Sequence, residues 1–166
     1  DDKFKNFIIK NTKIENTIFV SLSARYIFKK NIINSFKKNL VNFHGSRLPL
    51  DAGGGGYSWR IMREDRIDNQ LVHVINENLD TGLIIKSKLS LFPKHCQIPI
   101  DFEIYSNKNF INFYSEFIKK VKIGNFFYLK SQSKYLGRYN PRLNTDSDGL
   151  IDWDMDSYDL LNFINA

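Results

Sequence analysis

Short apolar runs alternate with stretches of helical spacing in the first part of the chain. Residues 17–22 (TIFVSL) and 40–44 (LVNFH) are compact runs of β-branched and aromatic side chains, which is typical of buried strands. Residues 24–36 between them, and residues 3–11 before them, repeat apolar side chains at the period of a helix. A strand, a helix and a second strand in this order predict a right-handed crossover between parallel strands.

The second part of the chain continues the alternation. The pattern predicts a loop over 46–56, a helix over 57–65, and strands over 69–76 and 83–92 joined by a turn at 77–82. It then predicts a long helix over 98–124, irregular chain or weak strand over 125–149, and a closing helix with an Asp or Ser cap near 156–157. The long helix carries Phe110, Phe113, Phe117 and Val121 on one stripe and ends before Gly124. These elements predict an α/β fold of three layers, with a mostly parallel sheet and helices on both of its faces.

Composition narrows the class of protein. The 166 residues suffice for one domain with a core, because 42% are apolar and 14% aromatic. No apolar run approaches the roughly 18 to 20 residues that span a bilayer, so we expect no membrane partner. The net charge of +6 comes mostly from lysines in a chain also rich in Asn and Ile, so it is weak evidence for nucleic-acid binding.

The single cysteine, Cys96, excludes an internal disulfide and favours a reducing, cytoplasmic compartment. His95 stands next to it, but neither residue has a partner at the spacing of metal ligands. We therefore expect no metal site.

Three polar residues lie where predicted strands end. Asn42 and His44 are two positions apart on one strand and therefore share a face, and Asp80 lies in the turn at 77–82. Function in α/β sheets lies beyond the carboxyl ends of the strands. An Asn amide can stabilise an oxyanion, a His can take a proton near neutral pH, and a carboxylate can orient that His. Because no nucleophile elbow and no glycosidase carboxylate pair is present, the set favours acyl transfer to an amine, in which the substrate supplies the nucleophile. Taken singly, each residue also fits a turn, a cap or a structural histidine.

Basic and glycine residues follow the strand predicted over 40–44. Arg47, Arg60, Arg63 and Arg66 suit phosphate groups, although a solvated surface is the alternative. The glycine run 53–56 lets backbone approach a bulky acceptor or move as it binds, and a flexible surface loop is the alternative.

The segment NFHGSRLPLDAGGGGYSWRIMRED, followed by NLDTG, resembles the formyltransferases that use 10-formyltetrahydrofolate. That family includes methionyl-tRNA formyltransferase, glycinamide ribonucleotide formyltransferase and the amino-sugar N-formyltransferases. Its signature is an Asn-x-His pair, a Ser-x-Leu-Pro segment and a Leu-Asp-x-Gly turn, matched here by Asn42, His44, Ser46, Leu48, Pro49 and Asp80. The resemblance covers residues 14–92, and GGGGYSW departs from the family's usual mixture of Gly, Ala and Pro.

The resemblance implies roles for these residues. Asn42 and His44 would stabilise the oxyanion, His44 would help to deprotonate the amine, and Asp80 would handle protons through water. The residues expected to hold the folate are Leu22, Ser23, Ala24, Arg25, Asn78, Leu79 and Asp80. Those expected to bind the acceptor are Ser46, Gly54, Gly55, Arg60 and Arg63.

The resemblance also implies a Rossmann-like catalytic domain over 1–145 that lacks its first strands before Asp1, followed by a linker and helix over 146–166. The donor would be 10-formyltetrahydrofolate. The acceptor amine, on methionyl-tRNA or on a nucleotide-linked amino sugar, and the oligomeric state both stay open. The alternatives are a non-catalytic folate- or nucleotide-binding remnant and, less well supported, a nucleic-acid-binding module.

Overall fold

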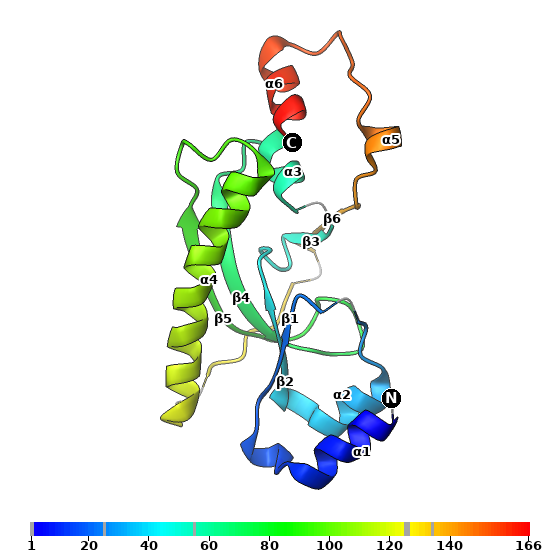
Figure 1. The fold of residues 1–166 in the computed structure, drawn as a ribbon, viewed down its shortest axis with the longest axis vertical. Helices are drawn as coiled ribbons and strands as arrows, with labels where there is room; N and C mark the ends of the chain where they lie inside the picture. The colour runs from blue at the N-terminus through cyan, green and yellow to red at the C-terminus, as the bar shows by residue number, and fades with distance from the viewer. Residues whose placement is uncertain (1, 25, 55, 125–126, 134) are drawn as a thin grey trace.

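A mixed sheet of four strands forms the centre of the molecule, in the order β1 (Phe19–Leu22), β2 (Leu40–His44), β4 (Ile67–Val74) and β5 (Ile84–Leu91) (Figure 1). The computed structural model describes residues 2–24, 26–54, 56–124, 127–133 and 135–166. A second, two-stranded sheet pairs β3 (Asp51–Gly53) with β6 (Arg138–Asn140). The α-helices are α1 (Asp2–Asn11), α2 (Lys30–Phe36), α3 (Gly56–Met62), α4 (Pro99–Lys122), α5 (Thr145–Asp148) and α6 (Ser157–Asn165), and short 3₁₀ turns occupy Ile14–Asn16 and Lys37–Asn39.

Strand directions confirm one part of the predicted topology and correct another. β1 and β2 are parallel, with Phe19 opposite Leu40, as the strand–helix–strand order predicts. β2 pairs antiparallel with β4, and β4 pairs antiparallel with β5. The prediction of a mostly parallel sheet is therefore wrong for these described strands. For β4 and β5 the physical reason is the short turn between them, because parallel strands need a crossover of a dozen or more residues.

Helix α4 covers one face of the sheet (Figure 1). Phe113 and Phe117 are fully buried against Val41, Phe43 and Val72. The Phe43 ring meets the Phe117 ring edge to face, with centroids 5.3 Å apart. The predicted apolar stripe is thus confirmed. The helix also ends as predicted, since Gly124 follows it with φ +70° and donates its N–H to Val121 O.

Helix α2 packs on the opposite side, where Ile32, Ile33 and Phe36 enclose Leu40. It begins at Lys30, so the helix predicted over 24–36 is too long at its start. Residues 26–28 line a cavity instead of continuing the helix. Side chains on β2 alternate between the two faces, which leaves Asn42 and His44 on the side away from α4.

The last part of the chain returns to α3. Strand β6 lies within the stretch predicted as irregular chain or weak strand and pairs with β3. Helix α6 starts as predicted, because the Asp156 side chain accepts hydrogen bonds from the backbone N–H groups of Tyr158 and Asp159. Ser58 Oγ donates to Ala166 O, which fixes the end of α6 against α3. Among the helices of the described ranges, none combines the length and apolar character needed to cross a bilayer.

The contact between α4 and the sheet generates the first prediction. Phe117→Ala should lower the free energy of unfolding by about 3–5 kcal/mol, because it leaves a cavity in a fully packed core. Ile111→Ala is the matched control on the same helix, since Ile111 is 63% exposed, and it should change that free energy by less than about 0.5 kcal/mol. Urea unfolding curves measure both, and equal losses in the two variants would contradict this assignment of the core.

Candidate active site

A cavity of about 300 Å³ lies beyond the ends of β1 and β2. The end of β2 contributes Asn42 and His44, strand β4 contributes His73, and the turn after β4 contributes Asp80. The segment 23–28, described except for residue 25, forms another wall. Strand ends from two parallel strands therefore meet a turn from a third strand at one crevice, where α/β folds bind ligands.

Four of the predicted folate-contacting residues, together with Asp80, line this cavity: Ser23, Ala24, Asn78 and Leu79. Arg25 lies outside the described residues. Leu22 is not among the lining residues, and its side chain is 49% exposed. Successive side chains of a strand point to opposite faces of the sheet. The preceding residue, Ser21, is buried and lines the cavity, so the Leu22 side chain faces the other way.

The three predicted catalytic residues lie together. His44 Nε2 lies 3.8 Å from Asp80 Oδ2, which is longer than a direct hydrogen bond. His44 Nε2 is itself buried and has no hydrogen-bond partner among the described residues. Asn42, two positions earlier on the same face of β2, extends to the same crevice. The expectation that positions far apart in the sequence converge is met by this geometry.

A fourth residue, His73, joins this set and was not predicted. It lies directly opposite Asn42 in the β2–β4 pairing, and its side chain is 3% exposed. Its Nδ1 lies 2.9 Å from Val74 O, which can only accept a hydrogen bond, so Nδ1 carries the proton. In the neutral ring, Nε2 then accepts from Asn42 Nδ2 at 3.3 Å. This hydrogen bond orients the Asn42 amide and leaves its second N–H free to donate elsewhere.

Only a weak signal in the sequence pointed to His73. It is a polar residue within the apolar strand predicted over 69–76, and such residues need a partner when buried. The partner could be named only once the register between β2 and β4 was known.

Burial and nearby charges set the state of both histidines. Burial is the largest influence on His44 and lowers its pKa; Asp80 opposes this effect, and the Arg60 guanidinium adds to it. Burial also lowers the pKa of His73, the hydrogen bond to Val74 O and the Asp80 charge oppose it, and His44 adds to it. Both imidazoles are therefore held neutral near pH 7, the state in which a histidine can accept a proton.

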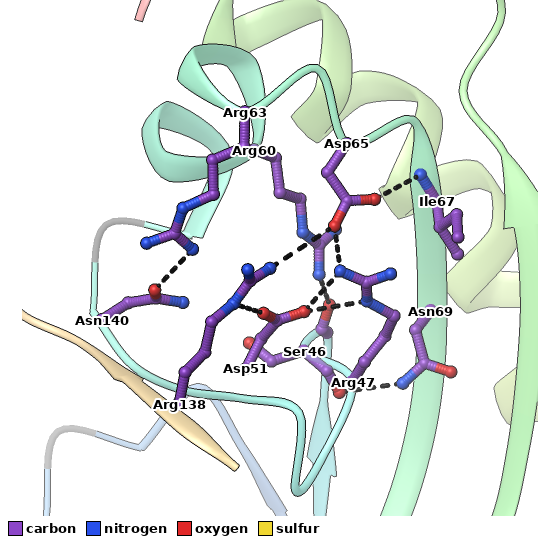
Figure 2. A network of polar contacts seen from close by, with 11 residues as sticks. Ser46, Arg47, Asp51, Arg60, Arg63, Asp65, Ile67, Asn69, Arg138 and Asn140 are labelled. Carbon is purple, nitrogen blue, oxygen red and sulfur yellow. Dashed lines mark hydrogen bonds and ion pairs between the residues drawn. The ribbon is translucent and has the colours of Figure 1, made fainter. Parts of the chain in front are cut away.

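The loop after His44 is held by an ion-pair network (Figure 2). Arg47 Nε donates to Asp51 Oδ2 at 2.8 Å, and Arg47 Nη2 also pairs with Asp65. From the far segment, Arg138 Nε donates to Asp51 Oδ1 at 2.7 Å. Burial alone would raise the pKa of Asp51, but the hydrogen bonds from Arg138 and Arg47 outweigh it and hold that pKa below its usual value. The loop is thus tied to β6 and to the residues between α3 and β4.

The predicted acceptor-binding arginines differ from one another. Arg60 is only 5% exposed, and its Nη2 donates to Gly45 O at 2.9 Å, directly after His44. This geometry corrects the expectation of an accessible phosphate ligand, because the guanidinium is buried and faces its own chain. Arg63 is exposed, stacks on the Trp59 ring at 4.8 Å and donates to Asn140 Oδ1 at 2.8 Å. Figure 2 shows the two side chains diverging from α3.

The remaining acceptor-side residues lie in the same loop. Ser46 O accepts a hydrogen bond from Asn69 Nδ2 at 2.8 Å. Gly54 donates its N–H to Asn140 O at 2.8 Å, and a Cβ on Gly53, whose φ is +100°, would lie 2.1 Å from that same oxygen. The close approach of β6 therefore requires glycine at position 53, and a Cβ on Gly54 would lie 3.1 Å from Arg142 Cβ, just after β6. Gly55 lies outside the described residues.

Arg47, Arg63 and Arg138 line a second cavity of about 570 Å³ beside this loop, together with Tyr135. In the part of the chain that the structure describes, no group of three or more His, Cys, Asp and Glu side chains is arranged to hold a metal ion.

Comparison with known proteins gives the relatives of this chain; no family model matches it. It is 25% identical over 165 residues to the bifunctional polymyxin resistance protein ArnA of Wigglesworthia glossinidia brevipalpis, covering 93% of this chain and 23% of that protein. It is 26% identical over 166 residues to methionyl-tRNA formyltransferase of Prochlorococcus marinus (strain MIT 9312), covering 97% of this chain and 50% of that protein. The chain thus spans at most half the length of these two relatives.

A solved structure with a similar fold is that of WlaRD, a sugar 3N-formyl transferase crystallised in the presence of dTDP and 5-N-formyl-THF. Its TM-score is 0.75 at 24% identity, covering 97% of this chain and 61% of that chain. The mixed sheet with helices on both sides is therefore the Rossmann-like fold of the folate-dependent formyltransferases. Methionyl-tRNA formyltransferases are thus among the relatives of the chain, which confirms the resemblance carried by the Asn-x-His and Leu-Asp-x-Gly segments.

The contrast between Arg60 and Arg63 generates the second prediction. Arg60→Met removes a buried positive charge that lowers the pKa of His44, so that pKa should rise in the variant. Arg63→Met is the matched control, because Arg63 points to Asn140 instead, and the pKa of His44 should stay unchanged. Titration of the histidine ring resonances by NMR measures both, and an unchanged or lower pKa in Arg60→Met would contradict the electrostatic role of Arg60.

Proposed function

We propose that this chain transfers a formyl group from 10-formyltetrahydrofolate to a primary amine. The observation that carries the proposal is the convergence of Asn42, His44 and Asp80 on one cavity at the carboxyl ends of β1 and β2. The homology to methionyl-tRNA formyltransferases supports the same chemistry. A cytoplasmic location, suggested by the single free cysteine, remains part of the proposal.

Each residue of the site has a separate role in acyl transfer. The second N–H of Asn42, left free by its hydrogen bond to His73, donates to the oxygen on which negative charge develops. Neutral His44 takes the proton of the attacking amine, and Asp80 stabilises the imidazolium that results. The new bond joins the amine nitrogen to the formyl carbon, the bond to the folate nitrogen breaks, and the proton ends on that nitrogen.

The donor and the acceptor approach from different sides. The 300 Å³ cavity, with Ser23, Ala24, Asn78 and Leu79 on its walls, is assigned to the pterin ring of the folate. The second cavity, at the other end of the loop that begins after His44, is assigned to the acceptor, because Arg63 and the half-exposed Arg138 line it. Methionyl-tRNA and a nucleotide-linked amino sugar both carry phosphate that a guanidinium binds well.

The third prediction tests the chemistry. Mass spectrometry should detect formyl transfer from 10-formyltetrahydrofolate to methionyl-tRNA or to a dTDP-linked amino sugar. Asn42→Ala and His44→Ala should each lower turnover roughly 100- to 1000-fold while folate affinity changes little, because each removes a group needed only in the transition state. His95→Ala is the control, since His95 is exposed and lies outside the cavity.

Near wild-type turnover in His44→Ala would contradict the proposed mechanism. Folate binding by the wild-type chain without transfer to either acceptor would instead favour the non-catalytic folate-binding alternative.

The fourth prediction tests the acceptor side. Arg63→Met should raise the Michaelis constant of the acceptor about tenfold or more and leave that of the folate unchanged, because it removes a hydrogen bond to a charged group. Lys108→Met, which removes an exposed cation from α4, controls for a general effect of charge. Equal changes for both substrates would show that Arg63 does not contact the acceptor.

A further inference from the structure

Gln132 connects a distant segment to the turn that carries Asp80. Its side-chain Nε2 donates to Asp80 O at 2.9 Å and to Gly82 O at 2.7 Å. Both hydrogens of one amide are thus used on two carbonyls of the same turn. Gln132 lies 50 or more positions from either acceptor in the sequence, within the stretch predicted as irregular chain or weak strand.

The turn that Gln132 contacts is conformationally constrained. Asp80 has φ +55°, a left-handed conformation that residues with a Cβ adopt far less readily than glycine. Two residues later, a Cβ on Gly82 would lie 1.6 Å from Val74 O, so the chain passes directly against β4. The base of the turn is closed by the hydrogen bond from Val74 N to Leu83 O. Left-handed backbone of this kind persists where surrounding contacts fix it, and such contacts cluster at functional sites.

The segment that carries Gln132 is itself anchored at two places. The Phe127 ring stacks on the buried Phe117 ring with centroids 5.0 Å apart. Lys130 exchanges two backbone hydrogen bonds with Ile84, of 2.8 and 2.9 Å, at the start of β5. Gln132 therefore extends from a segment that is fixed to α4 and β5, and its two hydrogen bonds can hold the turn in place.

We propose that Gln132 is a positioning residue that holds the Asp80 carboxylate between His44 and His73. The carboxylate oxygens lie 3.8 Å from His44 Nε2 and 3.7 Å from His73 Nε2, so a small rotation of the turn would break both contacts. The geometric part of this proposal stands by itself. Its consequence for turnover rests on the formyl transfer proposed above.

Three variants of the full chain test the proposal. Gln132→Met keeps the length of the side chain but removes both donors. Ser131→Ala changes an exposed neighbour in the same segment and serves as the matched control. Asp80→Asn removes the charge and gives the reference for complete loss of the carboxylate.

The first readout is the titration of the histidine rings by NMR, which is simple because the chain has three histidines. The charges that act on His44 are Asp80 and Arg60, and those that act on His73 are Asp80 and His44. Asp80 raises the pKa of both rings, so Asp80→Asn should lower both values. Gln132→Met should shift them in the same direction by a smaller amount, and Ser131→Ala should leave them unchanged.

The second readout is the kinetics of formyl transfer from 10-formyltetrahydrofolate. Gln132→Met should lower kcat about 10- to 100-fold with little change in the Michaelis constant of the folate, as expected for a misplaced catalytic group. Far-UV circular dichroism and the urea midpoint establish that the variant is folded.

Folded Gln132→Met protein with wild-type histidine pKa values would overturn the proposal. Shifted pKa values in a chain whose wild type transfers no formyl group would support the positioning role and contradict the proposed function, so the two failures can be told apart.

Discussion

The packing of β2 against α4 is the constraint on which the rest of the structure depends. Val41 and Phe43 pack against fully buried phenylalanines of α4. Because side chains alternate along a strand, fixing these two residues on one face fixes their neighbours on the other face. Asn42 and His44 are therefore directed to the opposite side of the sheet, where the cavity lies. A slip of one residue in the register of β2 would bury the candidate catalytic side chains under α4 and expose the aromatic core.

The same sheet decides the chemical state of the site. Antiparallel pairing places His73 opposite Asn42, and the buried surroundings keep both histidine rings neutral. Two opposite charges then act on His44, the Asp80 carboxylate from the turn after β4 and the Arg60 guanidinium from α3. Because these groups are largely shielded from water, each charge has more influence than it would in solution. The proton affinity of His44 thus depends on where the turn after β4 places Asp80 and where α3 places Arg60.

Elements with a strong local pattern were predictable from the sequence. The β2 run, the stripe on α4 with its terminal Gly124, and the Asp156 cap of α6 each follow from side-chain period and capping chemistry within a few residues. The predictions failed where a long-range contact overrides local preference. Residues 26–28 line the cavity although their spacing is helical, and Gly53 and Gly54 contact β6 and the residue after it, a pairing that local pattern does not indicate.

For the site, the sequence by itself determined the chemistry that is available. Asn42, His44 and Asp80 are recognisable because their residue types and their places at strand ends are local properties. The tertiary structure alone decided which further groups act on them. His73 depends on the register between two strands, Arg60 on the direction in which α3 presents its side chains, and Gln132 on a segment anchored to α4 and β5. Hydrogen bonds and charges act over a few ångströms in space regardless of separation along the chain, so their partners are fixed only when the chain has folded.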